Sequence, residues 1–138
     1  MTKAEIIEFL NANPTCYLAT SQNNKPYVRA IRMYRADEKG IILSTVDGKD
    51  LAIHMKENPN IEICFYNAEK NVQIRVSGKA TLLEDLDLKK EIVEQRPFLK
   101  PLVDQRGYAA ILVFRIADCA AYVWTMQTNL LPKEYMKF

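Results

Sequence analysis

The sequence predicts a mainly β protein with flanking helices, in which an antiparallel sheet closes into a small barrel. Six or seven strand-like segments stand against only three helical ones, and short polar loops connect most consecutive strands. Loops this short join antiparallel strands, because a parallel pair requires a crossover of a dozen or more residues. The chain of 138 residues is close to the commonest single-domain size, so we expect one domain over residues 1–138.

The first half of the chain is expected to hold two helices and three strands. Thr2 and Glu5 have the spacing of a capping box, which begins a short amphipathic helix. Strand-like runs follow at 16–20, 27–35 and 41–45. The polar loop that ends at Gly40 indicates that the second and third of these strands pair as a hairpin. A second helix begins within residues 47–50 and ends at about Glu57.

The second half is expected to add four strands and a broken helical segment. The strands lie at 61–66, 72–83, 108–116 and 120–126. Gly78 interrupts the second of them and indicates a bulge or a close approach of two backbones. Asp85 is placed to cap a helix that ends near Arg96, and Pro101 interrupts the segment that follows.

Two apolar segments predict that the protein is a homodimer. The strand at 108–116 is the most apolar in the chain, and the tail at 130–138 carries Tyr135 and Phe138 close to two leucines. A barrel of this size cannot cover both segments, so we expect them at an interface between two copies of the chain.

Composition and charge argue against several classes of partner. Acids and bases are interspersed at a net charge of +2, so the chain has no basic stripe for nucleic acid. No apolar run approaches the roughly 18 residues that span a bilayer. The first residues carry acids where a signal peptide is apolar, so we expect no membrane partner and a place in the cytoplasm.

Cysteine and histidine usage predicts no metal site. Cys16, Cys64 and Cys119 lie far apart in apolar surroundings, as buried free thiols do. His54, the only histidine, has no partner pattern and is expected on the surface of its helix. Neither residue type forms the cluster that a zinc site requires.

Polar residues on the strands point to a ligand that carries a phosphate. Arg29 and Arg32 are three apart on a strand, so they face opposite sides, and alone they fit a solvated edge strand. The next strand ends in Ser44 and Thr45, and Lys49 follows at the start of a helix. Hydroxyls, an ammonium group and free backbone amides at a helix start then meet at one corner, where a phosphate fits.

Gln73 adds a side chain that can hydrogen-bond the edge of a heterocyclic ring. It shares the polar face of its strand with Arg75, and its side chain offers both a donor and an acceptor, as the edge of an isoalloxazine requires. A solvated face is the alternative interpretation for this strand. For Trp124 the preferred interpretation is a core residue, and the alternative is a ring that lies against a ligand near a dimer interface. Together these residues favour a flavin nucleotide as the ligand.

In order and spacing, these segments resemble the pyridoxamine 5′-phosphate oxidase-like family of flavin-binding split barrels. The matching segments are Lys25–Arg29, the loop to Gly40, Thr45, Asn58–Pro59 and Gln73–Lys79, within a resemblance that covers about residues 5–83 well. The resemblance implies a six-stranded antiparallel Greek-key split β-barrel, an obligate homodimer, and two FMN sites at the interface between the chains.

By residue match, the resemblance implies nine cofactor-binding residues: Arg29, Ala30, Ile31, Arg32, Ser44, Thr45, Lys49, Gln73 and Trp124. Arg29 and Lys49 would hold the phosphate, and the stretch 29–32 would lie along the flavin, partly through its backbone. The hydroxyls at 44–45 would bond the ring or the ribityl chain. Gln73 would address the ring edge, and Trp124 would come from the partner chain.

Departures from the family pattern disfavour oxidation of pyridoxamine phosphate itself. Tyr34 stands where the true oxidase has a lysine, and its Arg-x-His signature is absent after Trp124. Asp50 and Leu51 occupy the positions of an Arg-Lys pair, so Lys49 is the only cation in that loop. The closer resemblance is to short members described as general-stress-like or nitroimidazole-resistance-like.

The expected function is that of an FMN-binding oxidoreductase acting on a small organic substrate that the sequence does not identify. No residue is singled out as a general acid or base. The alternatives are a deazaflavin-dependent reductase and a non-enzymatic module that binds flavin or haem for storage or sensing.

Overall fold

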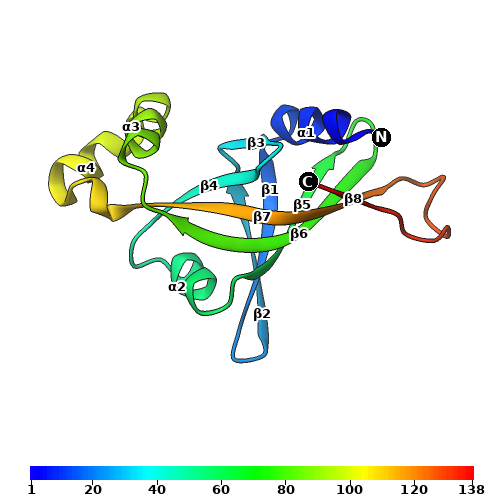
Figure 1. Ribbon diagram of the computed structural model, residues 1–138, viewed down its shortest axis with the longest axis horizontal. Helices are drawn as coiled ribbons and strands as arrows, with labels where there is room; N and C mark the ends of the chain where they lie inside the picture. The colour runs from blue at the N-terminus through cyan, green and yellow to red at the C-terminus, as the bar shows by residue number, and fades with distance from the viewer.

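The computed structural model describes residues 1–138 as one sheet with helices at its ends and over one side (Figure 1). The helices are α1 (Lys3–Ala12), α2 (Asp50–Glu57), α3 (Leu86–Gln95) and α4 (Lys100–Arg106), with the 3₁₀ turns η1 (Pro97–Leu99) and η2 (Tyr108–Ala110). The strands are β1 (Thr15–Gln22), β2 (Lys25–Arg32), β3 (Arg35–Asp37), β4 (Gly40–Val46), β5 (Asn60–Asn67), β6 (Val72–Leu83), β7 (Ile111–Trp124) and β8 (Tyr135–Lys137). Figure 1 shows α3 and α4 together at one end of β7, and the loop that follows β7 at its other end.

The sheet confirms the expected fold class of an antiparallel split barrel. Its strands follow the order β2-β1-β5-β6-β7-β4-β3, with β8 added beside β7, and every pair is antiparallel. The end strands β2 and β3 do not pair with each other, so hydrogen bonds do not close the sheet. Only Met33 and Tyr34 separate them in the chain, so the backbone itself connects the two ends. The expected number of six strands was wrong, because the sheet contains eight.

The segment expected as one strand at 27–35 is divided into β2 and β3. At the break, the N–H of Met33 bonds the carbonyl of Pro14 at 2.8 Å, and the N–H of Tyr34 bonds the carbonyl of Ile42 at 3.0 Å. The chain therefore changes its pairing partner there, and β2 pairs with β1 while only β3 forms the hairpin with β4 at Gly40. Met33 is 1% exposed, and burial of its side chain holds the break in place.

Strand β7 also differs from expectation, because it joins two segments predicted as separate strands. It runs without interruption from Ile111 to Trp124, and Asp118 absorbs a local irregularity with a φ of 51°. The predicted bulge at Gly78 is confirmed, since the register between β6 and β7 shifts there. A Cβ at Gly78 would lie 2.6 Å from the Cγ2 of Ile116, so only glycine allows the two strands to approach this closely.

The core lies in two parts. The larger cluster of 23 buried residues fills the barrel, with Phe65 and Phe114 among its largest fully buried side chains. A second cluster places Ile111 and Val113 under α3, where each is 0% exposed. The expectation that the strand at 108–116 exposes apolar surface was therefore wrong, because α3 covers it within one chain. The tail does expose apolar side chains, and Leu130 is 94% accessible.

Helices α1, α2 and α3 begin where the sequence predicts. The expectation that Pro101 interrupts its segment was wrong, because Pro101 lies in the first turn of α4, where no backbone N–H is needed. In α1 the N–H of Glu5 bonds the Thr2 hydroxyl at 3.2 Å and the Glu5 carboxylate bonds the N–H of Thr2 at 2.6 Å, which confirms the capping box. In α3 the N–H of Leu88 bonds the Asp85 carboxylate at 3.0 Å. None of the helices combines the length and the apolar character needed to cross a membrane.

Candidate functional site

A cavity of about 590 Å³ lies between β2, the end of β4, the start of α2 and the η1 turn. Its volume is in the range of small-molecule and cofactor sites. The residues around it come from all four elements: Arg29, Ala30, Ile31, Arg32, Ser44, Thr45, Val46, Gly48, Lys49, Asp50, Leu51, Arg96, Phe98 and Leu99. Segments more than sixty residues apart in the chain thus share one concave surface.

Seven of the nine residues that the sequence suggested lie around this cavity, and two do not. Arg29 to Arg32, Ser44, Thr45 and Lys49 are among its walls. Gln73 and Trp124 are instead cross-strand neighbours on β6 and β7, outside the cavity of this chain. The first interpretation of Trp124 as a core residue was wrong, because the ring is only partly buried and its Nε1 donates to the Oδ1 of Asn129 at 2.8 Å.

Burial alternates along β2 as the sequence predicts for a strand. Arg29 is on the inward side and partly buried, whereas Arg32 is exposed. Both nevertheless border the cavity, because β2 is an end strand of the sheet and its rim is open on both sides. Two arginines from opposite faces of one strand therefore border the same cavity.

Arg29 is held by neutral partners. Its Nη1 donates to the Thr20 hydroxyl at 2.7 Å and to the carbonyl of Leu18 at 3.4 Å, and its Nη2 lies 3.3 Å from the Nδ1 of His54. Burial lowers the pKa of Arg29, and the charge of Asp50 acts in the opposite direction. The positive charge is therefore kept partly desolvated at the cavity wall.

His54 is 3% exposed, so its expected place on the helix surface was wrong. The signal was present in the sequence, because Leu51, His54 and Met55 are spaced three and four apart and share one face of α2. That face packs against the sheet, and it brings the imidazole to Thr20 on β1. The structure thus connects the single histidine with Arg29.

The corner where β4 meets α2 offers several unused donors. The Thr45 hydroxyl, only 9% exposed at residue level, makes no hydrogen bond to another group of the chain. The N–H groups of Asp50 and Leu51 at the start of α2 also have no acceptor in the chain. Lys49 is exposed beside them, and Asp50 places one carboxylate at the same end. Free N–H groups at a helix start and a nearby ammonium form a typical anion site.

Sequence reasoning missed Arg96, which it took only as the end of a helix. Its Nη1 donates to the Ser44 hydroxyl at 3.2 Å, and its Nη2 donates to the carbonyls of Arg32 and Met33 at 3.2 and 3.0 Å. The guanidinium also lies 5.3 Å from the ring centroid of Tyr34. Burial lowers the pKa of Arg96, and the charge of Arg32 acts in the same direction.

Next to Arg96, Phe98 and Leu99 of η1 supply apolar walls, and Phe98 is 75% exposed. These side chains come from a segment that the sequence marked only by its two prolines, so nothing in their spacing predicted a wall of the cavity. The cavity is thus cationic along β2, hydrogen-bonding at the start of α2 and apolar along η1.

Comparison with known proteins identifies the family. The family model described as Pyridoxamine 5′-phosphate oxidase (PNPOx_N) matches residues 2–118. The chain belongs to this family. A pyridoxine/pyridoxamine 5′-phosphate oxidase from Enterobacter sp. (strain 638) is 33% identical over 81 residues, which cover 57% of this chain and 37% of that protein. The chain therefore matches little more than a third of the length of this relative.

Several solved structures share the fold of this chain. A NimC/NimA family protein from Clostridium acetobutylicum is 22% identical with a TM-score of 0.78, over 98% of this chain and 91% of that chain. A protein related to general stress protein 26, also from Clostridium acetobutylicum, is 18% identical with a TM-score of 0.73, over 98% and 93% of the two chains. The resemblance that the sequence suggested is confirmed.

Two other structures with this fold have names that state a bound group. One is a FAD-binding protein from Mesorhizobium loti, 20% identical with a TM-score of 0.61, over 91% of this chain and 96% of that chain. The other is HutZ, the haem storage protein from Vibrio cholerae, 18% identical with a TM-score of 0.60, over 85% and 90% of the two chains. The family fold therefore holds both flavin-binding and haem-storing proteins.

Proposed function

We propose that this protein binds FMN in the cavity bordered by β2 and α2, and that it is a flavin-dependent oxidoreductase for a small organic substrate. The observation that carries the proposal is the convergence of Arg29, Thr45 and Lys49 with the free N–H groups at the start of α2. Family membership and a flavin-binding structure with the same fold support it. Bound FMN would supply the redox chemistry through its isoalloxazine ring.

The chemistry of the cavity fits a flavin nucleotide. Lys49, the N–H groups of Asp50 and Leu51, and Arg29 of β2 would hold the phosphate. The free hydroxyl of Thr45 is available to the ribityl chain or the ring. The Asp50 carboxylate opposes an anion at the same corner, so we expect weaker retention of FMN than a site with cations alone would give.

We further propose that the working site needs a second copy of the chain. Gln73 and Trp124 neighbour each other on β6 and β7 and lie outside the cavity of their own chain. That cavity has Phe98 as its one aromatic wall residue and has no side-chain amide for a ring edge. In a homodimer they would complete the cavity of the partner. The exposed tail around Leu130 and Tyr135 supplies apolar surface for such an interface.

The proposed substrate is not pyridoxamine phosphate. Tyr34 replaces the lysine of the true oxidase, and its hydroxyl donates to Glu91 at 2.6 Å, so it provides no cation for a substrate phosphate. The protein's own contribution to the reaction is orientation of the flavin and exclusion of water by Phe98 and Leu99.

A titration followed by visible spectroscopy tests the cofactor. FMN should bind at micromolar concentration with quenched fluorescence and an absorption band near that of free FMN. Parallel titrations with a deazaflavin and with haemin separate the alternatives, because haemin with an axial ligand gives a distinct Soret band. His54 is buried behind Arg29 and does not border the cavity, which disfavours it as such a ligand. Failure of FMN to bind at micromolar concentration would contradict the proposal.

A further inference from the structure

We propose that Thr20 and His54 are positioning residues that aim the Arg29 guanidinium at an anionic group in the cavity, the phosphate of FMN. This inference rests on the proposed function. It assigns a role to two buried polar side chains that sequence reasoning took as an ordinary strand residue and a surface histidine.

The burial of the two residues is the first argument. Thr20 and His54 are each 3% exposed, and neither is among the walls of the cavity. Both contact Arg29, which does border the cavity. The polar contacts of these side chains therefore reach the cavity through Arg29.

The direction of the hydrogen bonds is the second argument. Arginine can only donate, so the Thr20 oxygen accepts from Arg29 at 2.7 Å. The single hydroxyl hydrogen of Thr20 is then free to donate to the Nδ1 of His54 at 2.8 Å. The Nη2 of Arg29 also points its hydrogen at this nitrogen from 3.3 Å. We assign His54 the tautomer with a bare Nδ1 and the hydrogen on Nε2, because only this tautomer lets Nδ1 accept from both groups.

Charge is the third argument. Arg35, Arg75 and Arg115 each lie within 4.0 Å of a carboxylate, which offsets part of their charge. Arg29 has no carboxylate within that distance and is held only by a hydroxyl, a carbonyl and a neutral imidazole. Neutral anchors fix the direction of a guanidinium without cancelling its charge. A fixed donor with an uncancelled charge is what preorganised binding of an anion requires.

Packing restricts the imidazole as well. The ring of Tyr27 lies 4.5 Å from the ring of His54, centroid to centroid, and covers one of its sides. The imidazole thus lies between its own helix, α2, and the β1–β2 hairpin. A rigid acceptor in this position limits the conformations open to Arg29, so less entropy is lost when a ligand binds.

A double-mutant cycle on FMN affinity tests the inference. His54→Leu should weaken FMN about tenfold in the wild-type background and leave FMN affinity unchanged in an Arg29→Gln background, because the histidine acts through the arginine. His54→Asn, which keeps an acceptor near the position of Nδ1, should restore most of the affinity. Thr20→Val should behave like His54→Leu, and Thr20→Ser like wild type. Riboflavin, which lacks the phosphate, should bind all these variants alike and shows that they are folded.

A second measurement reads the hydrogen-bond chain without any flavin. His54 is the only histidine, so its imidazole nitrogens give the only histidine signals in an NMR spectrum of ¹⁵N-labelled protein. We expect a bare, hydrogen-bonded Nδ1 whose signal shifts in Thr20→Val and in Arg29→Gln. An Nδ1 that carries the hydrogen, or equal FMN losses in both backgrounds, would overturn the positioning role alone. Absence of FMN binding by the wild type would overturn the proposed function and this inference with it.

Discussion

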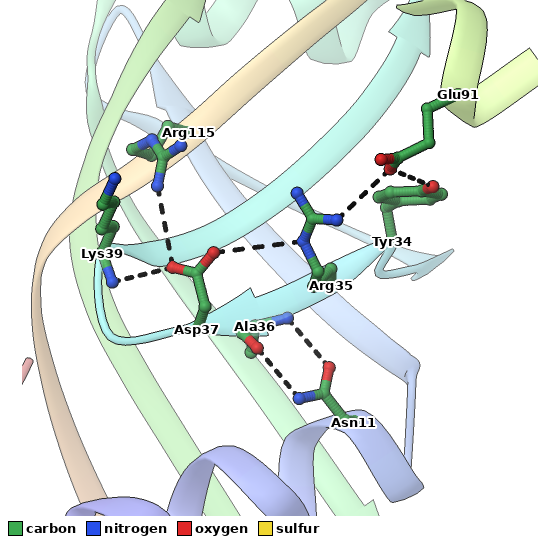
Figure 2. Close-up of polar contacts among 8 residues, drawn as sticks. All are labelled: Asn11, Tyr34, Arg35, Ala36, Asp37, Lys39, Glu91 and Arg115. Carbon is green, nitrogen blue, oxygen red and sulfur yellow. Dashed lines mark hydrogen bonds and ion pairs between the residues drawn. The ribbon is translucent and has the colours of Figure 1, made fainter. Parts of the chain in front are cut away.

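The Tyr34 hydroxyl donates a 2.6 Å hydrogen bond to the carboxylate of Glu91, which lies 57 residues further along the chain (Figure 2). The same carboxylate bonds Arg35 at 3.3 Å, so one acid of α3 contacts two neighbouring side chains at the start of β3. The ring of Tyr34 also lies against the guanidinium of Arg96. This contact therefore joins α3 to the break between β2 and β3 and supports one wall of the cavity.

Replacement of Tyr34 by phenylalanine should destabilise the protein modestly. The substitution removes one hydrogen bond but leaves the ring, so we expect a loss of about 1 kcal/mol in the free energy of unfolding. Urea denaturation near neutral pH measures it. Tyr17→Phe is the matched control, because the Tyr17 side chain is exposed and its hydroxyl makes no hydrogen bond in the chain. Equal losses of unfolding free energy in both variants would show that the hydrogen bond to Glu91 does not stabilise the folded protein.

The same contact predicts a pH dependence. Burial raises the pKa of Tyr34 to about 12 from its ordinary 10.0, and the hydrogen bond to Glu91 adds to the rise. Because the folded pKa is above the unfolded one, the stabilisation by Tyr34 is complete below about pH 10 and is lost as pH rises towards about 12. The stability difference between wild type and Tyr34→Phe should stay constant below about pH 9 and shrink above about pH 10. A stability difference that stays constant above about pH 10 would contradict the hydrogen bond between Tyr34 and Glu91.

Lys49→Ala should weaken FMN more than riboflavin. The ammonium is assigned to the phosphate, which riboflavin lacks. Lys49 is exposed, so solvent screens its charge and we expect a loss of roughly two- to fivefold in FMN affinity. Lys56→Ala is the control, since it removes an equal charge from the other end of α2 and outside the cavity. Equal weakening of both ligands by Lys49→Ala would show that the lysine contacts the flavin ring or stabilises the fold, and does not bind the phosphate.

Subunit complementation should reveal whether two chains build one site. We expect the protein to sediment near twice 15.9 kDa. Arg29→Gln and Trp124→Ala should each weaken FMN binding. When equal amounts of the two variants are mixed and their subunits exchange, about a quarter of all FMN sites should regain wild-type affinity. Each mixed dimer then holds one cavity in which both residues are intact. No recovery on mixing, or a monomer with full FMN affinity, would place Trp124 outside the partner's site.

The three cysteines should differ in reactivity. Burial raises the pKa of Cys16 to about 12 and that of Cys119 to about 11, so almost no thiolate forms at about pH 8. Cys64 is only partly buried, and its pKa is raised less by the same cause. A chromogenic thiol reagent should therefore label about one thiol in the native protein and all three in urea. Cys64→Ser should abolish the native labelling, and rapid labelling of Cys16 would contradict its burial.

Local signals predicted most of the secondary structure. The capping box at Thr2 and Glu5 involves residues three apart, and the bulge at Gly78 follows from a single missing Cβ, so both could be read from a few residues. The break at Met33 could not be predicted this way, because it depends on a hydrogen bond to Pro14 and on burial among distant side chains. Continuous strand propensity cannot show where a strand changes partner.

The sequence by itself determined the family fold and one wall of the site. The stretch from Arg29 to Arg32 and the corner at Thr45 and Lys49 are short segments whose residue types and spacing already describe an anion site, and they do border one cavity. Only the tertiary structure decided that Arg96 reaches this cavity and that His54 lies beneath Arg29. These contacts join α2 to β2, and the end of α3 to β4. They depend on how helices pack on a sheet, which the order of residues along one strand or helix does not contain.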